Sequence, residues 1–246
     1  MSKSDVSTLR IAVVGKGNVG THLTRALAQR FTVVNIDSRN LHTFPEDCDV
    51  ALICVSDKVI PDMAKSLKGK AGIIAHTSGS VPMEVLEDSA SSYGVFYPMQ
   101  TFTKDSPMEY ADIPFFIEGN NRETVSILSE IASNVSSSVN EADSAQRKRL
   151  HLASVFACNF SNHLVGIADS ILKEGGMNYT MLLPLLRRTI QKLESLSPAE
   201  AQTGPAARED YPILEAHLRM LESTPERQEL YRLLSSDIIN SKRQQP

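Results

Sequence analysis

A stripe of polar side chains on a predicted apolar helix offers candidates for proton-transfer chemistry. Residues three or four positions apart, which share one face of a helix, are Lys148, His151, Val155, Asn159 and Asn162. Because buried polar groups need partners, we expect His151 and Asn159 to line a cleft. An imidazole exchanges protons near neutral pH, whereas Lys148 would need a lowered pKa to act as general acid or base. The basic run at 146–149 is also typical of a solvated helix end, which leaves both interpretations of Lys148 open.

Two further groups of polar residues follow predicted strands. His76 and Ser78 come directly after the apolar run 72–75, and Tyr97 lies in the run 94–99. Ligands of an open α/β sheet bind at the carboxyl ends of strands, so we expect His76 and Ser78 to contact substrate. A helix N-cap supplied by Ser80 is the structural alternative. Tyr97, with an ordinary pKa of about 10, can donate a proton or a hydrogen bond, or it can simply pack beneath the loop.

A turn at 203–210 enters another predicted helix and carries two charged residues. Arg208 is a candidate for binding a substrate carboxylate, because a guanidinium can hold it with two hydrogen bonds. An ion pair between Arg208 and Asp210 is at least as good an explanation. Cysteine and histidine residues show no metal-ligand spacing, so we expect no metal site.

A glycine-rich turn is the strongest motif of the chain. The β-type run 10–14 leads directly into Gly15-Lys-Gly17-Asn-Val-Gly20, and a helical pattern follows. Gly15 permits a sharp turn, Gly17 lets a pyrophosphate approach the backbone, and Gly20 allows close packing of helix on strand. This context predicts a dinucleotide-binding turn. The remaining residues expected to contact the dinucleotide are Asn18, Val19, Val55 and Ser56.

The end of the next predicted strand, 31–36, bears on the choice of dinucleotide. An acidic residue there binds the ribose hydroxyl of NAD, whereas a nearby arginine accommodates the 2′-phosphate of NADP. The chain continues Asp37-Ser38-Arg39, so both signals are present. Alternation along the strand should turn Asp37 away from the ribose. A solvated loop charge is the plain alternative for Arg39.

The order of these elements predicts the fold class. Up to residue 140 strands alternate with helices, and from residue 141 only helical patterns appear, at 142–173, 179–196, 208–221 and 225–240. We therefore expect an α/β protein with a Rossmann-like, doubly wound, mostly parallel sheet in residues 1–140. An all-helical domain for substrate binding and dimerisation should follow in residues 141–246, with the ligand crevice between the two. Pro114 predicts that the strand at 113–117 lies near a sheet edge.

Composition excludes several classes of partner. The 246 residues are 41% hydrophobic and 22% charged, with a formal net charge of −4, as in ordinary globular proteins. The chain has no long cluster of lysines and arginines and no apolar run long enough for a bilayer, so we expect neither nucleic-acid nor membrane binding and a cytoplasmic location. Cys48, Cys54 and Cys158 are scattered, which predicts buried thiols in a reducing compartment.

Together these segments resemble the 6-phosphogluconate dehydrogenase-like oxidoreductases, a group that includes pyrroline-5-carboxylate, β-hydroxyacid and ketopantoate enzymes. The most similar family places a Rossmann-like domain before a helical domain of unknown function. Its motifs match Cys54-Val-Ser-Asp57, His76-Thr-Ser-Gly79, Lys148-x-x-His151 and Thr203–Asp210. The chain departs from the family at Tyr97, where histidine is usual, and at Glu209, where glycine is usual. Tyr97-Pro-Met also resembles the catalytic His-Pro-Met of prephenate dehydrogenases.

The resemblance implies an NADP-dependent oxidoreductase that transfers a hydride to or from a small acid, imine or ketone. Ser38 and Arg39 fall where these enzymes carry an Asn-Arg pair, which implies NADP, and Lys148 falls near their proton-transferring lysine. A non-catalytic NADP-binding regulator is the main alternative. A structural protein with a vestigial Rossmann fold is disfavoured by the intact glycines. The apolar helix 142–173 and the habit of related enzymes predict a homodimer formed by the helical domain.

Overall fold

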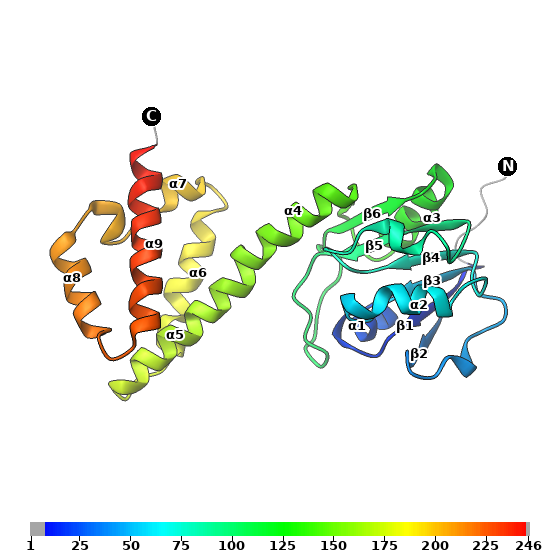
Figure 1. Ribbon diagram of the computed structural model, residues 1–246, viewed down its shortest axis with the longest axis horizontal. Helices are drawn as coiled ribbons and strands as arrows, with labels where there is room; N and C mark the ends of the chain where they lie inside the picture. Colours follow the sequence, from blue (N-terminus) through cyan, green and yellow to red (C-terminus); the bar gives the residue numbers. More distant parts are fainter. Residues whose placement is uncertain (1–7, 245–246) are drawn as a thin grey trace. The chain divides into compact units, whose positions relative to one another are not determined.

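The computed structural model describes residues 8–244, and the chain divides into two compact units, Met1–His163 and Leu164–Pro246. Within the described part of the first unit, the strands form a seven-stranded sheet of order β2-β1-β3-β4-β5-β6-β7 (Figure 1). Its strands are β1 Arg10–Val14, β2 Thr32–Ile36, β3 Val50–Ile53, β4 Ile73–His76, β5 Ser92–Pro98, β6 Phe115–Gly119 and β7 Val139–Glu141. Only the β5–β6 pair is antiparallel. The predicted mostly parallel, Rossmann-like sheet is confirmed.

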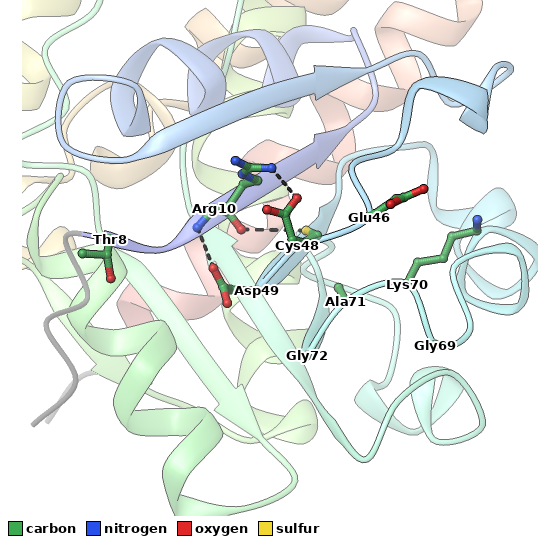
Figure 2. Close-up of a pocket in the computed structure, with 10 residues that line it drawn as sticks. Thr8, Arg10, Glu46, Cys48, Asp49, Gly69, Lys70, Ala71 and Gly72 are labelled. Atoms are coloured by element: carbon green, nitrogen blue, oxygen red, sulfur yellow. Dashed lines mark hydrogen bonds and ion pairs between the residues drawn. The ribbon is translucent and has the colours of Figure 1, made fainter. Parts of the chain in front are cut away.

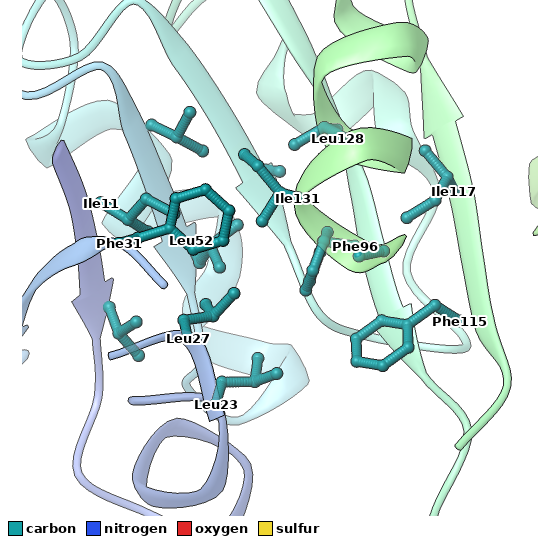
Figure 3. Close-up of a cluster of buried hydrophobic side chains, with 14 of the residues drawn as sticks. Ile11, Leu23, Leu27, Phe31, Leu52, Phe96, Phe115, Ile117, Leu128 and Ile131 are labelled. Atoms are coloured by element: carbon teal, nitrogen blue, oxygen red, sulfur yellow. The ribbon is translucent and has the colours of Figure 1, made fainter. Parts of the chain in front are cut away.

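The central strands are apolar along their whole length because both faces of the sheet are covered. Every residue of β3 and β4 is buried, as expected for inner parallel strands. On one face, α1 Asn18–Leu27 and α3 Arg122–Ser133 contribute Leu27 and Leu128 to a core that also includes Phe96 (Figure 3). On the other face, α2 Ile60–Ser66 packs into a second core. Helices on both faces make the sheet doubly wound.

The prediction that the strand at 113–117 lies near a sheet edge is approximately correct. β6 is second from the edge, because the short strand β7 pairs with it in parallel. Pro114 itself lies one residue before β6, where its missing N–H costs no ladder hydrogen bond. β7 ends at Glu141, beside the predicted boundary at 140, whereas the compact unit continues to His163. The helix that follows β7 therefore belongs with the sheet.

The predicted helix at 142–173 is present with an interruption. It consists of α4 Ser144–Ser154, a π-helical segment Val155–Phe160 and α5 Ser161–Glu174. Hydrogen bonds in a π-helix run from residue i to i+5, which shifts the angular positions of the side chains. The polar face predicted from Lys148 to Asn162 is therefore not continuous. The cysteine prediction was wrong at one position, because Cys158 in this segment is exposed while Cys48 and Cys54 are buried.

The second unit is helical, as expected. Its helices are the rest of α5, α6 Leu183–Lys192, α7 Pro198–Ala201, α8 Tyr211–Met220 and α9 Pro225–Arg243. Within the predicted helical range 179–196, Pro184 occupies the first turn of α6, where no N–H is needed. None of the described helices is long and apolar enough to cross a membrane.

The helical unit buries little of its apolar surface. In its described part, residues 164–244, only Ala206 and Leu214 are buried. Large apolar side chains stand exposed on several of its helices, among them Ile171, Met181, Leu185, Ile190, Met220 and Leu233. This unit therefore has almost no hydrophobic core of its own.

Candidate functional site

A groove of about 260 Å³ lies where β1, β3 and β4 end. Its lining residues are Gly17, Asn18, Val19, Cys54, Val55, Ser56, Asp57, Thr77 and Ser78. Six of these are residues that the sequence predicted to contact dinucleotide or substrate. The groove sits at the carboxyl edge of a parallel sheet, the position where open α/β folds bind ligands.

The glycine turn beside this groove is dictated by close backbone approaches. A Cβ on Gly15, whose φ is +129°, would lie 2.3 Å from the carbonyl oxygen of Cys54, and one on Gly20 would lie 2.1 Å from that of Gly15. A Cβ on Gly17 would meet nothing within 4 Å. The amide of Asn35 holds the turn by donating to the carbonyls of Val13 and Gly15. Gly17 thus leaves open space at the start of α1, which no side chain caps.

Arg39 and Asp37 form an ion pair just beyond β2. The guanidinium donates from Nε and Nη2 to the two carboxylate oxygens of Asp37, at 3.2 and 3.3 Å. These hydrogen bonds lower the pKa of Asp37. Arg39 is exposed and Ser38 is half-buried. The arginine therefore engages the carboxylate that an NAD ribose would need.

Tyr97 and His151 form a polar contact between β5 and α4. The phenol oxygen lies 3.4 Å from Nδ1 of His151, and the two rings meet edge to face. Tyr97 is buried, and this burial raises the pKa of its phenol. Gly79 packs against both side chains, since a Cβ there would lie 2.8 Å from Cζ of Tyr97 and 2.9 Å from Nδ1 of His151. This contact brings together two predicted catalytic residues that are 54 positions apart.

The sequence did not identify Arg147, the one fully buried side chain of the basic run at 146–149. Its Nη1 pairs with Glu118 of β6 at 2.5 Å. Its Nε donates to the carbonyl oxygen of Ser78 at 3.1 Å, and its Nη2 to that of Val81 at 2.5 Å. Its four-residue step to His151 places both on one helix face, but the three-residue step from Lys148 to His151 does the same, so the spacing did not single out Arg147.

His76 is fully buried and does not line the groove. Its Nδ1 accepts the N–H of Ser78 at 3.2 Å, while Nε2 has no hydrogen-bond partner among the described residues. Burial, assisted by the positive charge of Arg147, lowers the pKa of His76 to about 4. Its expected contact with substrate is therefore replaced by a role in holding the loop.

Ser78 holds the turn after β4. Its hydroxyl accepts the N–H groups of Ser80 and Val81, whereas the helical turn Met83–Leu86 follows Pro82 without any side-chain cap, so the N-cap expected of Ser80 is not formed. Ser78 also lines the groove. Ser80 instead donates to the carboxylate of Asp57 at 2.5 Å, tying the loop after β4 to the loop after β3.

Three other predicted residues lie on the surface. Lys148 is exposed on α4, and Asn159 is exposed in the π-helical segment. Arg208 is exposed in the helical unit, and among the described residues it forms no ion pair with Asp210. The neighbouring Glu209 has a φ of +52°, in the left-handed region that favours glycine, which accounts for the glycine usual at this position in the family that the sequence resembles. The carboxylate of Glu209 pairs with Arg243.

A larger cavity, of about 580 Å³, lies at the opposite edge of the sheet (Figure 2). Arg10 of β1 lies in it, together with Cys48 and Asp49, which precede β3. Because it sits at the amino ends of the strands, it is not where this fold class binds its ligands. Burial raises the pKa of Cys48 to about 11, which leaves that thiol protonated. In residues 8–244 no three metal-ligating side chains gather.

Comparisons with known proteins identify a family and several similar structures. The model of a family described as a domain of unknown function, DUF2520, matches residues 113–238. The structure of BF3122 from Bacteroides fragilis, named as a candidate NADP oxidoreductase, is 36% identical, with a TM-score of 0.90 over 96% of this chain and 100% of that chain. No curated protein matches the sequence.

Two more distant structures share the fold. Protein TM1727 from Thermotoga maritima is 22% identical, with a TM-score of 0.71, over 95% of this chain and all of that chain. An NADP-bound pyrroline carboxylate reductase from Plasmodium falciparum is 12% identical, with a TM-score of 0.57, over 95% of this chain and 99% of that chain.

Substituting His76→Asn should make the free energy of unfolding less dependent on pH. The folded-state pKa of about 4 lies below the ordinary 6.5, so the unfolded state binds more protons between these values. Stability that is fully present above pH 6.5 should therefore be lost as the pH falls toward 4, by on the order of 3 kcal/mol. Asparagine can still accept the N–H of Ser78. Denaturant unfolding at pH 4 to 7.5 measures the difference.

The exposed His42 provides the matched control. His42→Asn should leave the pH dependence of the wild type unchanged. If His76→Asn and the wild type lose stability in parallel over this interval, His76 is not buried in its neutral form.

Proposed function

The chain belongs to the family of the domain DUF2520, and from this premise we propose that it is an NADP(H)-dependent oxidoreductase. One observation carries the proposal. Ser78 lines the groove beside the glycine turn, and the next residue, Gly79, packs against Tyr97 and His151. A site for a dinucleotide and a pair of groups able to move a proton are thus joined by one short loop.

The groove residues fit the proposed cofactor. The open space at Gly17 and the uncapped start of α1 suit a pyrophosphate, and the exposed Arg39 suits a 2′-phosphate. When bound, the nicotinamide ring supplies or accepts the hydride. The name of BF3122 and the NADP bound to the pyrroline carboxylate reductase support the same choice.

Tyr97 and His151 are proposed to move the proton that accompanies the hydride. In the reducing direction, the Tyr97 hydroxyl donates its proton to the oxygen or nitrogen of the substrate. His151, protonated at Nδ1, then donates to the phenolate oxygen and regains its own proton from solvent, to which it is partly exposed. The raised pKa of Tyr97 keeps the phenol protonated at neutral pH, so the proton is present when the substrate binds. The reverse transfers serve oxidation.

The proposed substrate is a small acid, imine or ketone. In each class, the carbon that exchanges the hydride would be bonded to the oxygen or nitrogen that exchanges the proton. Lys148 lies three residues before His151 on α4 and is exposed. Its role in catalysis therefore stays a prediction. The same holds for substrate contacts by Asn159 and Arg208.

Arg39→Ala should weaken NADPH binding by about 1–3 kcal/mol, the cost of losing a charge-assisted hydrogen bond, and leave NADH binding nearly unchanged.

Gly17→Ala should weaken the binding of both NADPH and NADH about tenfold or more, since its methyl group would occupy the space offered to the pyrophosphate. Its melting temperature should stay near that of the wild type, because the added Cβ meets no protein atom. Fluorescence titration measures the affinities.

Arg30→Ala, at an exposed position away from the groove, is the control for loss of a positive charge. Equal weakening of NADPH and NADH by Arg39→Ala would contradict the assignment of Arg39 to the 2′-phosphate. Full NADPH affinity in Gly17→Ala would contradict the placement of the pyrophosphate.

Tyr97→Phe and His151→Gln should each lower kcat by about 10²–10⁴, the usual contribution of a general acid, while NADPH affinity stays within a few-fold. NADPH oxidation against a panel of small keto acids and cyclic imines identifies the substrate and measures the effect. Lys148→Met is assayed beside them, and a comparable loss would assign Lys148 to the same proton transfer.

Phe116→Leu, which changes the ring packed near Tyr97 without removing a polar group, is the control for local packing. Tight NADPH binding with no turnover in the whole panel would favour the non-catalytic regulator instead. Tyr97 stands where the family that the sequence resembles usually has histidine. This departure is the reason for considering the regulator as a second function.

We also propose a homodimer formed through the helical unit, whose large exposed apolar surface a second copy would cover. Light scattering should give about twice the 27.0 kDa chain mass. Leu185→Glu, on the exposed side of α6, should shift the mass toward the monomer, whereas Lys68→Glu on the sheet unit should not. A monomeric wild type at micromolar concentration would exclude this assembly.

A further inference from the structure

We propose that Arg147 is the positioning residue of the Tyr97–His151 pair: it fixes the loop Ser78–Val81 and α4 to each other. The inference rests on the proposed function, because it assigns a role within the same site. Arg147 does not contact either side chain of the pair by a hydrogen bond in the described residues. It acts through the backbone that both side chains pack against.

The hydrogen bonds of Arg147 bracket Gly79. Its Nε binds the carbonyl oxygen of Ser78 at 3.1 Å, one residue before the glycine, and its Nη2 binds that of Val81 at 2.5 Å, two residues after it. The planar guanidinium presents these donors in a fixed fork, so the two carbonyls are held at a fixed separation. Because Gly79 lies in contact with Tyr97 and His151, a displaced loop would displace the pair.

The other side of Arg147 fixes the start of α4. Its Nη1 pairs with Glu118 on β6, and the same carboxylate accepts hydrogen bonds from the N–H and the hydroxyl of Ser144, the first residue of α4. A capping box between Asp143 and Gln146 completes this turn. His151 lies four residues after Arg147 on the same helix face, so its position follows from that of the guanidinium.

Stability alone gives a poor reason for this arrangement. Moving two charges out of water costs several kcal/mol per ion in typical proteins, and well-packed apolar residues often stabilise a fold as well or better. A leucine or methionine could fill the volume of Arg147 but could not hold two loop carbonyls and a carboxylate in one geometry. The buried ion pair is therefore best explained by what it positions.

The test compares Arg147→Lys with Arg149→Lys, the same change at an exposed neighbour on α4. Lysine keeps the charge opposite Glu118 but cannot bind both carbonyls in the fork geometry. We expect Arg147→Lys to lower kcat about 100-fold, the effect of a misplacement near 1 Å, with KM changed far less. Arg149→Lys should match the wild type. Ultraviolet titration of the tyrosines, with Tyr97→Phe as reference, should show a shifted pKa of the Tyr97 phenol in Arg147→Lys and no shift in Arg149→Lys.

A second pair of variants covers the case in which Arg147→Lys does not fold. Glu118→Gln keeps the size of the partner and removes its charge, and it should show the same changes in kcat and in the phenol titration. Gly79→Ala leaves the Arg147 contacts intact but pushes against the ends of two side chains, Tyr97 and His151, which can move. It should fold and still lose about 100-fold in kcat.

The phenol titration needs no substrate, so it separates the two proposals. A wild type without turnover in any assay would defeat the proposed function, while the titrations would still decide the role of Arg147. Folded Arg147→Lys and Glu118→Gln variants with a wild-type phenol titration would overturn the inference, even if their melting temperatures fall. Unchanged kcat and titration in Gly79→Ala would overturn it as well.

Discussion

A buried guanidinium must have all its strong hydrogen-bond partners in place, and in this protein that requirement fixes three segments at once. Arg147 of α4 binds Glu118 of β6 and two carbonyls of the loop after β4. Removing any partner would leave a charge or a donor unsatisfied in a buried site, a cost larger than the net gain of an ordinary hydrogen bond. The segments can therefore move only together. The groove, through Ser78, and the Tyr97–His151 contact, through Gly79, both depend on this constraint.

The nucleotide groove follows from a second constraint, which is the absence of side chains. Gly15 and Gly20 let the turn, β3 and α1 approach so closely that a Cβ at either position would overlap a carbonyl oxygen. The close approach leaves the start of α1 exposed beside Gly17, where N–H groups face open space. The same glycine turn thus accounts for the close packing and for the exposed start of α1. Just beyond the next strand, the ion pair with Asp37 holds the exposed guanidinium of Arg39, the group that we propose for a 2′-phosphate.

Much of this could be predicted from the sequence, because continuous apolar runs and a glycine turn report directly on buried parallel strands and on backbone approach. Arg147 could not, since neighbouring residues on a helix point about 100° apart and the sequence does not say which member of a basic run faces the sheet. Nothing in the residue pattern indicated the π-helical segment either, and this segment moves Asn159 out of the predicted polar helix face. His76 was misplaced because a strand end can turn its side chain into the core as readily as into the groove.

The helical unit sets the remaining constraint. Ordering a residue costs roughly 1–2 kcal/mol of backbone entropy, which globular units recover mainly by burying apolar surface. In its described part, this unit buries only Ala206 and Leu214, while Leu185, Ile190 and Met220 remain largely exposed. Such a surface would not offset the entropy of ordering the helices. The missing burial must come from contacts beyond the unit itself. In the proposed homodimer, the folding of these helices and the association of the two copies would be one event, dependent on protein concentration.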